Sequence, residues 1–492
     1  MRILAYILAL TVALPLFFAC DNEDKFTNDG NIRLYFSSDT VRFDTVFTGI
    51  GTATKRLKIY NRDKKAVSIS DIELMSAGQT GFRMNVDGEN GNSVKNIEVL
   101  GKDSIYVLVE VTVNPLNKDN PLLIADSIRL RFNGVTQYIR LEAIGQDVVL
   151  WKAKKIDSDT VLSAGKPFLI YDMLDVSKNA KLTINKGVNL YFHSGAGVSV
   201  QGTIDVRGTV AEPVVFRGDR TDNMLESPVL PYDRVPGQWA GISVAGDSYG
   251  NIFENVRIRN SVHGILFYPS DTIQQKARLW NTIIQNTTKE GLWVVNAKIS
   301  AKNSLFANSA THAVRLLGGS YEFIHCTVAN YMFGAFITIR KPSMLIENEG
   351  ADMDGTTHSM ALGKCKIVNT IVSGSTISNN LVLSNNGKVA FNYLFDHCLL
   401  KQAGTDDSNF VKTVWNVDPR FGFIYSSETA TDNPDKVYLF NYDLGDNSPA
   451  ISAAVRILSD PDLRFDIRGV NRAADISGPD IGCYEKETAS DK

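Results

Sequence analysis

The segment Asn281-Thr-Ile-Ile-Gln-Asn286 recurs as Asn303-Ser-Leu-Phe-Ala-Asn308 and again as His325-Cys-Thr-Val-Ala-Asn330. Its first position advances from 281 to 303 to 325, in two steps of 22 residues. A fixed step of this size is typical of a solenoid in which each repeat forms one coil. Short β-branched runs broken by Asn and Gly indicate that each coil is made of strands. The repeat therefore predicts a parallel β-helix.

Stacked coils place equivalent side chains above one another, so identical residues form ladders along the stack. Amide side chains in such a ladder can bond to one another and to the backbone of the turns. We predict a structural ladder that includes an earlier copy of the repeat and one later copy, and in which a histidine replaces one asparagine. Its members are Asn255, Asn260, Asn281, Asn286, Asn303, Asn308, His325, Asn330 and Asn369.

Composition sets limits on function. The chain has 492 residues, is 44% hydrophobic and 21% charged, and carries a net charge of −3. This balance gives no electrostatic basis for binding nucleic acid. Neither a CxxC pair nor a Cys/His cluster with zinc spacing occurs, and we predict no cofactor. The four cysteines beyond the N-terminus are expected as small buried residues, with a disulfide as the alternative: Cys326, Cys365, Cys398 and Cys483.

The N-terminus reads as a targeting segment. An apolar run from Ile3 to Ala19 precedes Cys20, and Leu16-Phe-Phe-Ala-Cys20 resembles a bacterial lipobox. The resemblance implies a signal peptide over residues 1–20, a lipid on Cys20 and a tether over 21–30. The acidic Asp21-Asn-Glu-Asp24 resembles the surface-export signal of Bacteroidota lipoproteins. We expect an outer-membrane, cell-surface location, with a periplasm-facing anchor or a plain secretory signal as alternatives.

Residues 31–147 alternate apolar and polar positions, as in Ser104-Ile-Tyr-Val-Leu-Val-Glu-Val111, and contain turns such as Asn133-Gly134. This pattern predicts a β-sandwich. The stretch Leu57-Lys-Ile-Tyr-Asn-Arg62, followed by Ala66-Val-Ser-Ile-Ser70, resembles the immunoglobulin-like domains of Bacteroidota surface proteins. We expect this domain to act as a spacer.

Residues 148–405 are predicted to form the β-helix, and residues 406–492 its closing coils and cap. The order Gly187-Val, Gly202-Thr-Ile and Val214-Val-Phe-Arg-Gly218 resembles the first coils of bacterial right-handed parallel β-helix proteins. Gly478-Pro-Asp-Ile-Gly-Cys-Tyr-Glu485 resembles the closing segment of Bacteroidota β-helix lipoproteins. The resemblance implies an all-β surface lipoprotein with a sandwich, a right-handed parallel β-helix and a cap that shields the last open edge.

Evidence for catalysis in the sequence is thin. Glycoside hydrolysis requires two carboxylates beside the scissile bond, but the tract 281–330 contains only Glu290 and Glu322 as acids. An acidic insertion, residues 340–361, interrupts the repeat, and its Asp352-Met-Asp354-Gly355 faintly resembles a calcium loop. Asp352 and Asp354 are therefore weak metal candidates. The alternative is a solvated loop.

Outward-facing aromatic residues point to ligand binding. Strand alternation that turns Leu292 inward turns Trp293 outward, and the 22-residue step places Arg315 beside it. Trp280 and Lys302 form a similar row. Such rings can stack on a sugar or on a partner protein. Alternatively, these rows lie under a loop or against the sandwich.

These observations favour a non-catalytic surface lipoprotein that binds a glycan or a partner protein along one face of the β-helix. Two other functions remain open. One is a polysaccharide lyase or glycoside hydrolase with the pectin-lyase-like architecture. The other is a structural component of an envelope assembly.

Overall fold

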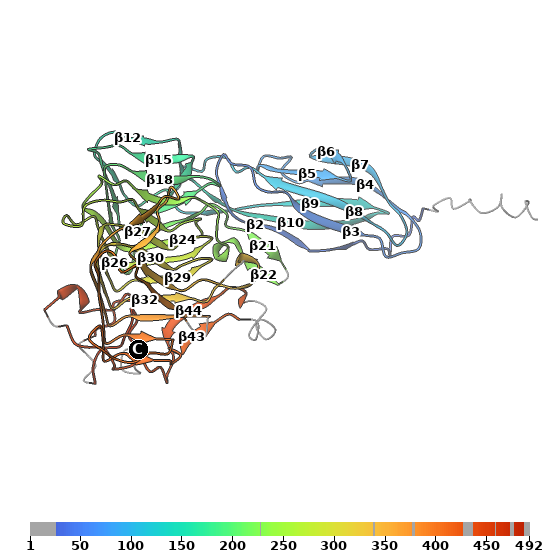
Figure 1. The fold of residues 1–492 in the computed structure, drawn as a ribbon. Helices are drawn as coiled ribbons and strands as arrows, with labels where there is room; N and C mark the ends of the chain where they lie inside the picture. Colours follow the sequence, from blue (N-terminus) through green and yellow to red (C-terminus); the bar gives the residue numbers. More distant parts are fainter. Residues whose placement is uncertain are drawn as a thin grey trace, which may run out of the picture. The chain divides into compact units, whose positions relative to one another are not determined.

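The computed structural model describes residues 26–226, 228–337, 340–375, 379–426, 436–457, 459–472 and 477–486. The chain divides into two compact units, Met1–Asp147 and Val148–Lys492. Figure 1 shows both, coloured along the sequence. The predicted signal peptide, Cys20 and most of the tether lie outside the described residues.

The first unit is a β-sandwich of two five-stranded sheets, ordered β1-β3-β8-β5-β6 and β2-β10-β9-β4-β7. The strands pair antiparallel except that β10 runs parallel to β2. Buried residues alternate with exposed ones along the strands, and both sheets contribute to one core. The structure thus confirms the all-β class, while the immunoglobulin-like assignment stays a prediction.

The strands of the sandwich are β1 (Tyr35–Phe36), β2 (Thr40–Phe47), β3 (Lys55–Tyr60), β4 (Val67–Leu74), β5 (Phe82–Val86), β6 (Glu89–Asn90), β7 (Ser93–Val99), β8 (Ser104–Val111), β9 (Leu122–Phe132) and β10 (Val135–Gln146).

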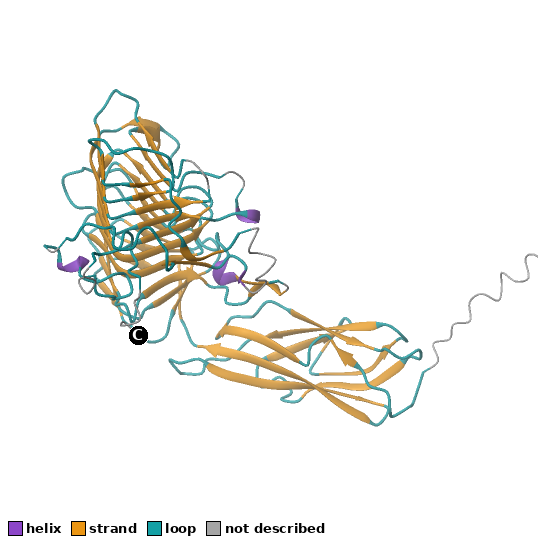
Figure 2. Ribbon diagram, turned by 90° about the horizontal axis from the view of Figure 1, so that it is seen from below, coloured by secondary structure: helices purple, strands orange, loops and turns teal. Residues whose placement is uncertain are grey.

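The second unit is a parallel coil with three faces, which we name sheets A, B and C (Figure 2). Each coil contributes one strand to each face, and every strand pairs in parallel with its equivalent in the next coil. The register follows the repeat, since Asn281 to Asn303 is one coil. This arrangement confirms the predicted β-helix; its handedness stays a prediction.

Sheet A contains β13 (Thr160–Leu162), β16 (Lys181–Asn185), β19 (Thr203–Arg207), β28 (Lys298–Lys302), β31 (Gly319–Ile324), β36 (Leu362–Val368), β39 (Phe391–Asp396), β41 (Phe410–Val411) and the first halves of β24 (Asn251–Arg259) and β26 (Ala277–Thr287). Sheet B contains β11 (Val149–Lys152), β14 (Phe168–Tyr171), β17 (Asn189–Phe192), β20 (Val214–Gly218), β29 (Leu305–Ser309), β32 (Thr327–Asn330), β37 (Ile371–Gly374), β40 (Leu399–Leu400), β42 (Val414–Trp415) and the second halves of β24 and β26. Sheet C contains β12 (Lys155–Ile156), β15 (Met173–Val176), β18 (Gly197–Val200), β23 (Gly241–Val244), β25 (Ile265–Phe267), β27 (Leu292–Val295), β30 (Val314–Leu317), β33 (Met344–Glu347) and β38 (Leu381–Ser384).

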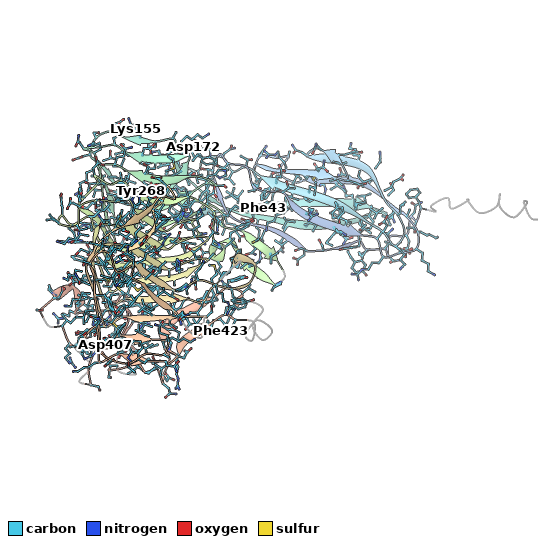
Figure 3. The ribbon with its side chains drawn as sticks, viewed as in Figure 1. Phe43, Lys155, Asp172, Tyr268, Asp407 and Phe423 are labelled. Carbon is cyan, nitrogen blue, oxygen red and sulfur yellow. The ribbon has the colours of Figure 1, made fainter. Side chains whose placement is uncertain are left out.

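The interior of the coil is filled by stacked aliphatic and aromatic side chains from all three sheets. Among them, Phe192 stacks on Trp239, with ring centroids 4.2 Å apart. In Figure 3, Lys155 and Asp172 mark the first coils, and Asp407 marks the other end of the stack. The last strands, β41 and β42, bring Phe410 and Trp415 against the end of this core.

Several short elements lie outside the three sheets of the coil. Two hairpins leave it, β21 (Asn223–Glu226) with β22 (Val229–Pro231), and β34 (Glu349–Ala351) with β35 (Thr357–Ser359). The predicted insertion 340–361 is thus only partly an insertion, because β33 (Met344–Glu347) within it belongs to sheet C. The other short elements are β43 (Phe421–Ile424), β44 (Phe440–Leu444), and the 3-10 turns η2 (Tyr232–Arg234), η3 (Gly334–Phe336) and η5 (Pro461–Leu463).

The segment predicted as closing coils and cap divides into two parts that pack against different surfaces of the coil. Residues 406–415 close the last coil through Phe410 and Trp415. The described residues between 418 and 486, which we name the return segment, instead run back along the outer side of sheet B. Small and aliphatic residues on that side, such as Leu305, Ala307 and Ala329, are buried by the return segment. It therefore covers a face of the coil rather than its open edge.

Candidate functional site

The corner between sheets A and B explains the asparagine repeat. Asn255, Asn281, Asn303, His325 and Asn369 all have a backbone φ between 47° and 51°. Asparagine tolerates this left-handed conformation better than other residues with a Cβ, because its short polar side chain bonds locally. The second set at the next bend, Asn260, Asn286 and Asn308, also has positive φ, whereas Asn330 is not among the positive-φ residues.

Side chains of the ladder bond along the stack only in part. Asn281 Nδ2 donates to Asn255 Oδ1 at 3.1 Å, and the Asn369 amide lies 2.9 Å from His325 Nε2. Between these two pairs, Asn303 turns to the return segment and donates to the carbonyls of Asp462 and Phe465. The ladder is thus open at the coils of Asn255 and Asn281 and covered by the return segment from Asn303 onward.

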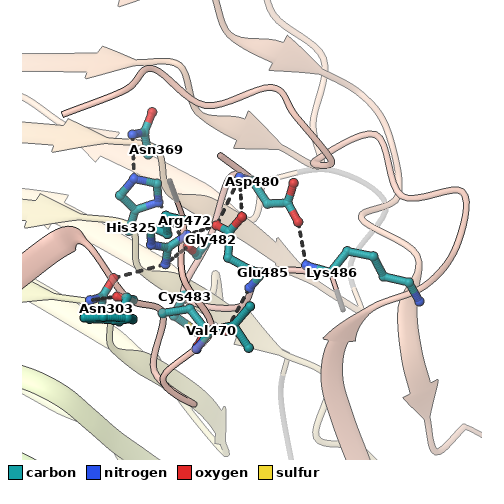
Figure 4. A network of polar contacts seen from close by, with 12 residues as sticks. Asn303, His325, Asn369, Val470, Arg472, Asp480, Gly482, Cys483, Glu485 and Lys486 are labelled. Atoms are coloured by element: carbon teal, nitrogen blue, oxygen red, sulfur yellow. Dashed lines mark hydrogen bonds and ion pairs between the residues drawn. The ribbon is translucent and has the colours of Figure 1, made fainter. Parts of the chain in front are cut away.

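A buried polar network fixes the return segment to the covered part of the ladder (Figure 4). Arg472 donates to Asn303 Oδ1 at 3.0 Å and forms an ion pair with Glu485, and both charged residues are about 4% exposed. Glu485 also accepts from the backbone N–H of Asp480. Burial raises the pKa of Glu485 to about 7, against the opposing charge of Arg472.

A groove begins where the return segment meets the open part of the ladder. Trp280, half-buried on sheet A, lines a cavity of about 320 Å³ with Lys302 and Phe465. Lys302 Nζ lies 5.1 Å from the centre of the Trp280 ring and is held by Asp460 at 2.6 Å. The sequence thus placed Trp280 and Lys302 together correctly, but Lys302 is already paired.

A second cavity, of about 370 Å³, lies on the sheet B side of the same corner. Arg257 and Gln285 line it from the coil, and Arg468 and Tyr484 line it from the return segment. Val210, which is 43% exposed, lines both cavities, so the two adjoin at the corner, and we name them together the groove. Sequence reasoning missed this half, because the return segment that forms its wall follows no repeat.

Trp293 and Arg315 do not form the exposed platform that strand alternation suggested. Trp293 is only 9% exposed because Met353 and Met360, from the β34–β35 hairpin and its end, pack against it. Arg315 lies 4.6 Å from the Trp293 ring centre and pairs with Glu347 at 2.8 Å. The alternative that this row lies under a loop is the correct one, and Trp280 and Trp293 occupy separate places on the coil.

A cluster of titratable side chains surrounds Trp293 on sheet C. His263 Nδ1 lies 3.3 Å from Glu290 Oε2. Burial works to raise the pKa of Glu290, but His263 and Arg315 outweigh it and leave that pKa below its usual value. Burial raises the pKa of Glu347 despite Arg315. The sequence did not reveal this cluster, because its members occupy different positions in successive coils.

The hairpin aspartates serve the turn in which they lie. Asp352 accepts from the backbone N–H groups of Asp354 and Thr356, each at 3.0 Å, and contacts His358 Nε2 at 2.8 Å. Over the described part of the chain, no group of three or more His, Cys, Asp or Glu side chains is gathered in a way that suits a metal ion. Asp352 therefore stabilises its own turn, and metal binding by Asp352 and Asp354 stays a prediction.

Cys326, Cys365, Cys398 and Cys483 are buried and free, and burial raises the pKa of each thiol. Such thiols are poor nucleophiles. None of the helices in the described ranges is long and apolar enough to cross a membrane.

Comparison with known proteins assigns no family. No family model and no curated protein matches the chain. Among solved structures, the catalytic unit of a GH87 α-1,3-glucanase from Streptomyces thermodiastaticus is similar over 73% of this chain and 88% of that one, at 10% identity and a TM-score of 0.27. At a TM-score this low, the similarity carries no argument about function.

Other solved structures resemble only part of the chain. A family 123 glycoside hydrolase from Clostridium perfringens matches 26% of this chain at 7% identity and a TM-score of 0.19. The Escherichia coli chaperone DraB matches 24% of it at 11% identity and a TM-score of 0.17. This chain spans about a third of the hydrolase and about half of the chaperone, 31% and 55% respectively.

Proposed function

We propose that the coil unit binds a carbohydrate chain in the groove around the corner of sheets A and B. The observation that carries the proposal is Trp280, a half-buried indole that lines the groove beside Lys302, with the Arg278 guanidinium 5.9 Å from its ring centre. An aromatic ring flanked by hydrogen-bond donors suits the apolar face and the hydroxyl rim of a sugar. Because each such contact is weak, on the order of 1 kcal/mol, we expect micromolar or poorer affinity that grows with chain length.

Substitution of Trp280 tests this proposal. Trp280→Ala should abolish retention by immobilised polysaccharides in a panel of acidic and neutral chains. Trp151→Ala is the matched control, because Trp151 is also half-buried and packs on Phe168 in the first coils, away from the groove. Retention of the Trp280 variant equal to that of the parent would refute the groove as the binding site.

A second candidate function is glycoside hydrolysis at the sheet C cluster. What favours it is a pair of nearly buried carboxylates whose environments shift their pKa values in opposite directions: Glu290 downward and Glu347 upward. Such a pair can divide the roles of base or nucleophile and acid. Reducing ends released by the parent protein but not by Glu290→Gln would establish it; the absence of any product would leave binding as the function.

We also propose that the protein is anchored to the outer membrane by a lipid on Cys20, with the sandwich as a spacer. The apolar run that ends at Cys20 supports this location. A structural role in an envelope assembly would use the same anchor. Glycan retention by the coil unit distinguishes binding from a purely structural role.

A further inference from the structure

We infer that Phe465 is a second aromatic residue of the binding site and that, together with Trp280, it holds an uncharged sugar unit. The inference rests on the proposed binding function and adds to it a residue of the return segment and the chemical class of the ligand. Both rings line the cavity of about 320 Å³, Trp280 from sheet A and Phe465 from the turn that follows η5. We name this space the Trp280 cavity.

The ring of Phe465 is exposed, although the backbone that carries it is fixed. Phe465 is 44% exposed. Its carbonyl accepts from Asn303 Nδ2 at 2.8 Å, and the residue pairs with Asn471 in an antiparallel bridge. Two residues before it and one residue after it, Leu463 and Asp466 are buried. Because this backbone is already ordered, the ring requires little further ordering when a ligand binds.

Apolar side chains gather at the Trp280 cavity instead of lying scattered over the surface. Val210, which is exposed, and Trp280, which is half-buried, line it together with Phe465. Single exposed apolar residues are common on proteins and need no explanation, whereas three around one cavity indicate a binding surface. The volume lies at the lower end of the range for small-molecule sites, roughly 300–1,000 Å³. The cavity therefore suits a short stretch of a glycan chain.

The charged side chains that line the Trp280 cavity are paired within the protein. The pairs are Lys302 with Asp460 and Asp462, Glu254 with Arg207, and Asp466 with Arg468, at distances from 2.6 to 3.6 Å. Among the lining residues that the structure describes, no cation is left over for an acidic sugar. An ionised group would lose hydration there without gaining a counter-charge. The cavity therefore favours an uncharged sugar.

The hydroxyl groups of an uncharged sugar need neutral hydrogen-bond partners, and the ladder supplies one. Asn281 and Asn255 line the Trp280 cavity, and Asn281 Nδ2 donates to Asn255 Oδ1 at 3.1 Å. Within the described ranges, no donor reaches Asn281 Oδ1, so this oxygen can accept from a sugar hydroxyl. The two rings can then contact the apolar C–H faces of the same sugar.

Substitution of Phe465 tests its part in the site. Phe465→Ala should weaken retention by an uncharged polysaccharide about fivefold, as expected for the loss of one aromatic contact. Affinity electrophoresis of the full protein in gels that contain dextran, mannan, galactan or a β-1,3-glucan measures this. Phe465→Tyr keeps the ring and should bind like the parent. Phe26→Ala is the matched control, because Phe26 is 46% exposed in the first unit, and thermal unfolding should be nearly the same for all of these variants.

The charge of the ligand is tested in gels that contain polygalacturonate or dextran sulfate. We expect stronger retention by at least one uncharged chain, at a strength that does not change with salt, because no ion pair forms. Stronger retention by the acidic chains would overturn the inference. A Phe465→Ala variant that binds like the parent, while Trp280→Ala does not bind, would also overturn it and leave carbohydrate binding intact. Failure of the parent to bind any chain would instead remove the proposed function, and this inference with it.

Discussion

At the scale of single residues, one backbone conformation decides which side chain occupies the corner of the coil. The corner requires a left-handed residue, and asparagine meets that requirement in Asn255, Asn281 and Asn303. The side chains then acquire different partners, since Asn281 bonds to a neighbouring coil and Asn303 bonds to the return segment. Backbone conformation and side-chain contacts are therefore separable at this position.

Replacing these asparagines by glycine isolates the side-chain contribution, because glycine keeps the left-handed conformation without strain. Asn303→Gly removes bonds to two backbone carbonyls and to the buried Arg472, and should lower the free energy of unfolding by about 1–3 kcal/mol. Asn281→Gly removes the bond to Asn255 and should cost less than about 1 kcal/mol. Urea unfolding measures both. Equal costs would mean that the return segment is not held at Asn303.

Glu485 makes the stability of the fold depend on pH. Burial raises the pKa of Glu485 from its ordinary 4.5 to about 7 in the folded protein, so the unfolded chain releases this proton at lower pH. Between these pH values the folded state binds more protons, and stability therefore falls as pH rises, by an amount on the order of 1–3 kcal/mol. Glu485→Gln should remove this component. From pH 4 to 8, the free energy of unfolding of the parent should fall relative to that of the Glu485→Gln variant. Parallel pH profiles would contradict the assignment of this component to Glu485.

At the scale of elements, the sequence predicted what is periodic and missed what depends on packing between distant segments. The repeat gave the strands of each coil and their register, because left-handed asparagines and β-branched runs act locally. Residues 406–492 were expected as closing coils and a cap, yet the return segment within them covers sheet B, because Leu305, Ala307 and Ala329 present an apolar outer side there. Which surface a non-repeating segment covers is not encoded by its own pattern.

The same reason explains why Trp280 and Trp293 differ. Strand alternation turned both outward, but only the β34–β35 hairpin decides that Trp293 is covered. Trp293→Ala should therefore destabilise the protein by about 3 kcal/mol or more, as for a large buried side chain. Trp280→Ala should cost much less, because its ring is partly in solvent. Thermal unfolding of the two variants checks this; similar shifts would show that the hairpin does not cover Trp293.

At the scale of the whole molecule, the features of the proposed binding site all lie in one of the two units. The groove, its arginines and the return segment all belong to residues 148–492, whereas the sandwich has a core of its own. Such a division suits a binding unit carried on a spacer behind a membrane anchor.

The proposed anchor has a direct test. Cys20→Ala should move the protein from the membrane pellet to the soluble fraction after cell lysis, because the lipid would have no attachment point. Cys398→Ala, which removes a buried thiol within the coil, should leave the fractionation unchanged. Persistence of the Cys20 variant in the membrane pellet would contradict lipid anchoring.

The return segment also constrains the order in which this chain can reach its final state. A coil can form as soon as its own residues are available, because it pairs with the preceding coil. The outer side of sheet B, however, waits for partners such as Asp462, which lies 159 residues after Asn303. At the usual pace of synthesis, about 5–20 residues per second, that interval lasts roughly 10–30 seconds. Throughout it, Leu305 and its apolar neighbours face solvent on an otherwise completed surface. Premature termination before the last residues would make that transient exposure permanent, so truncated chains should be the form of this protein most prone to aggregation.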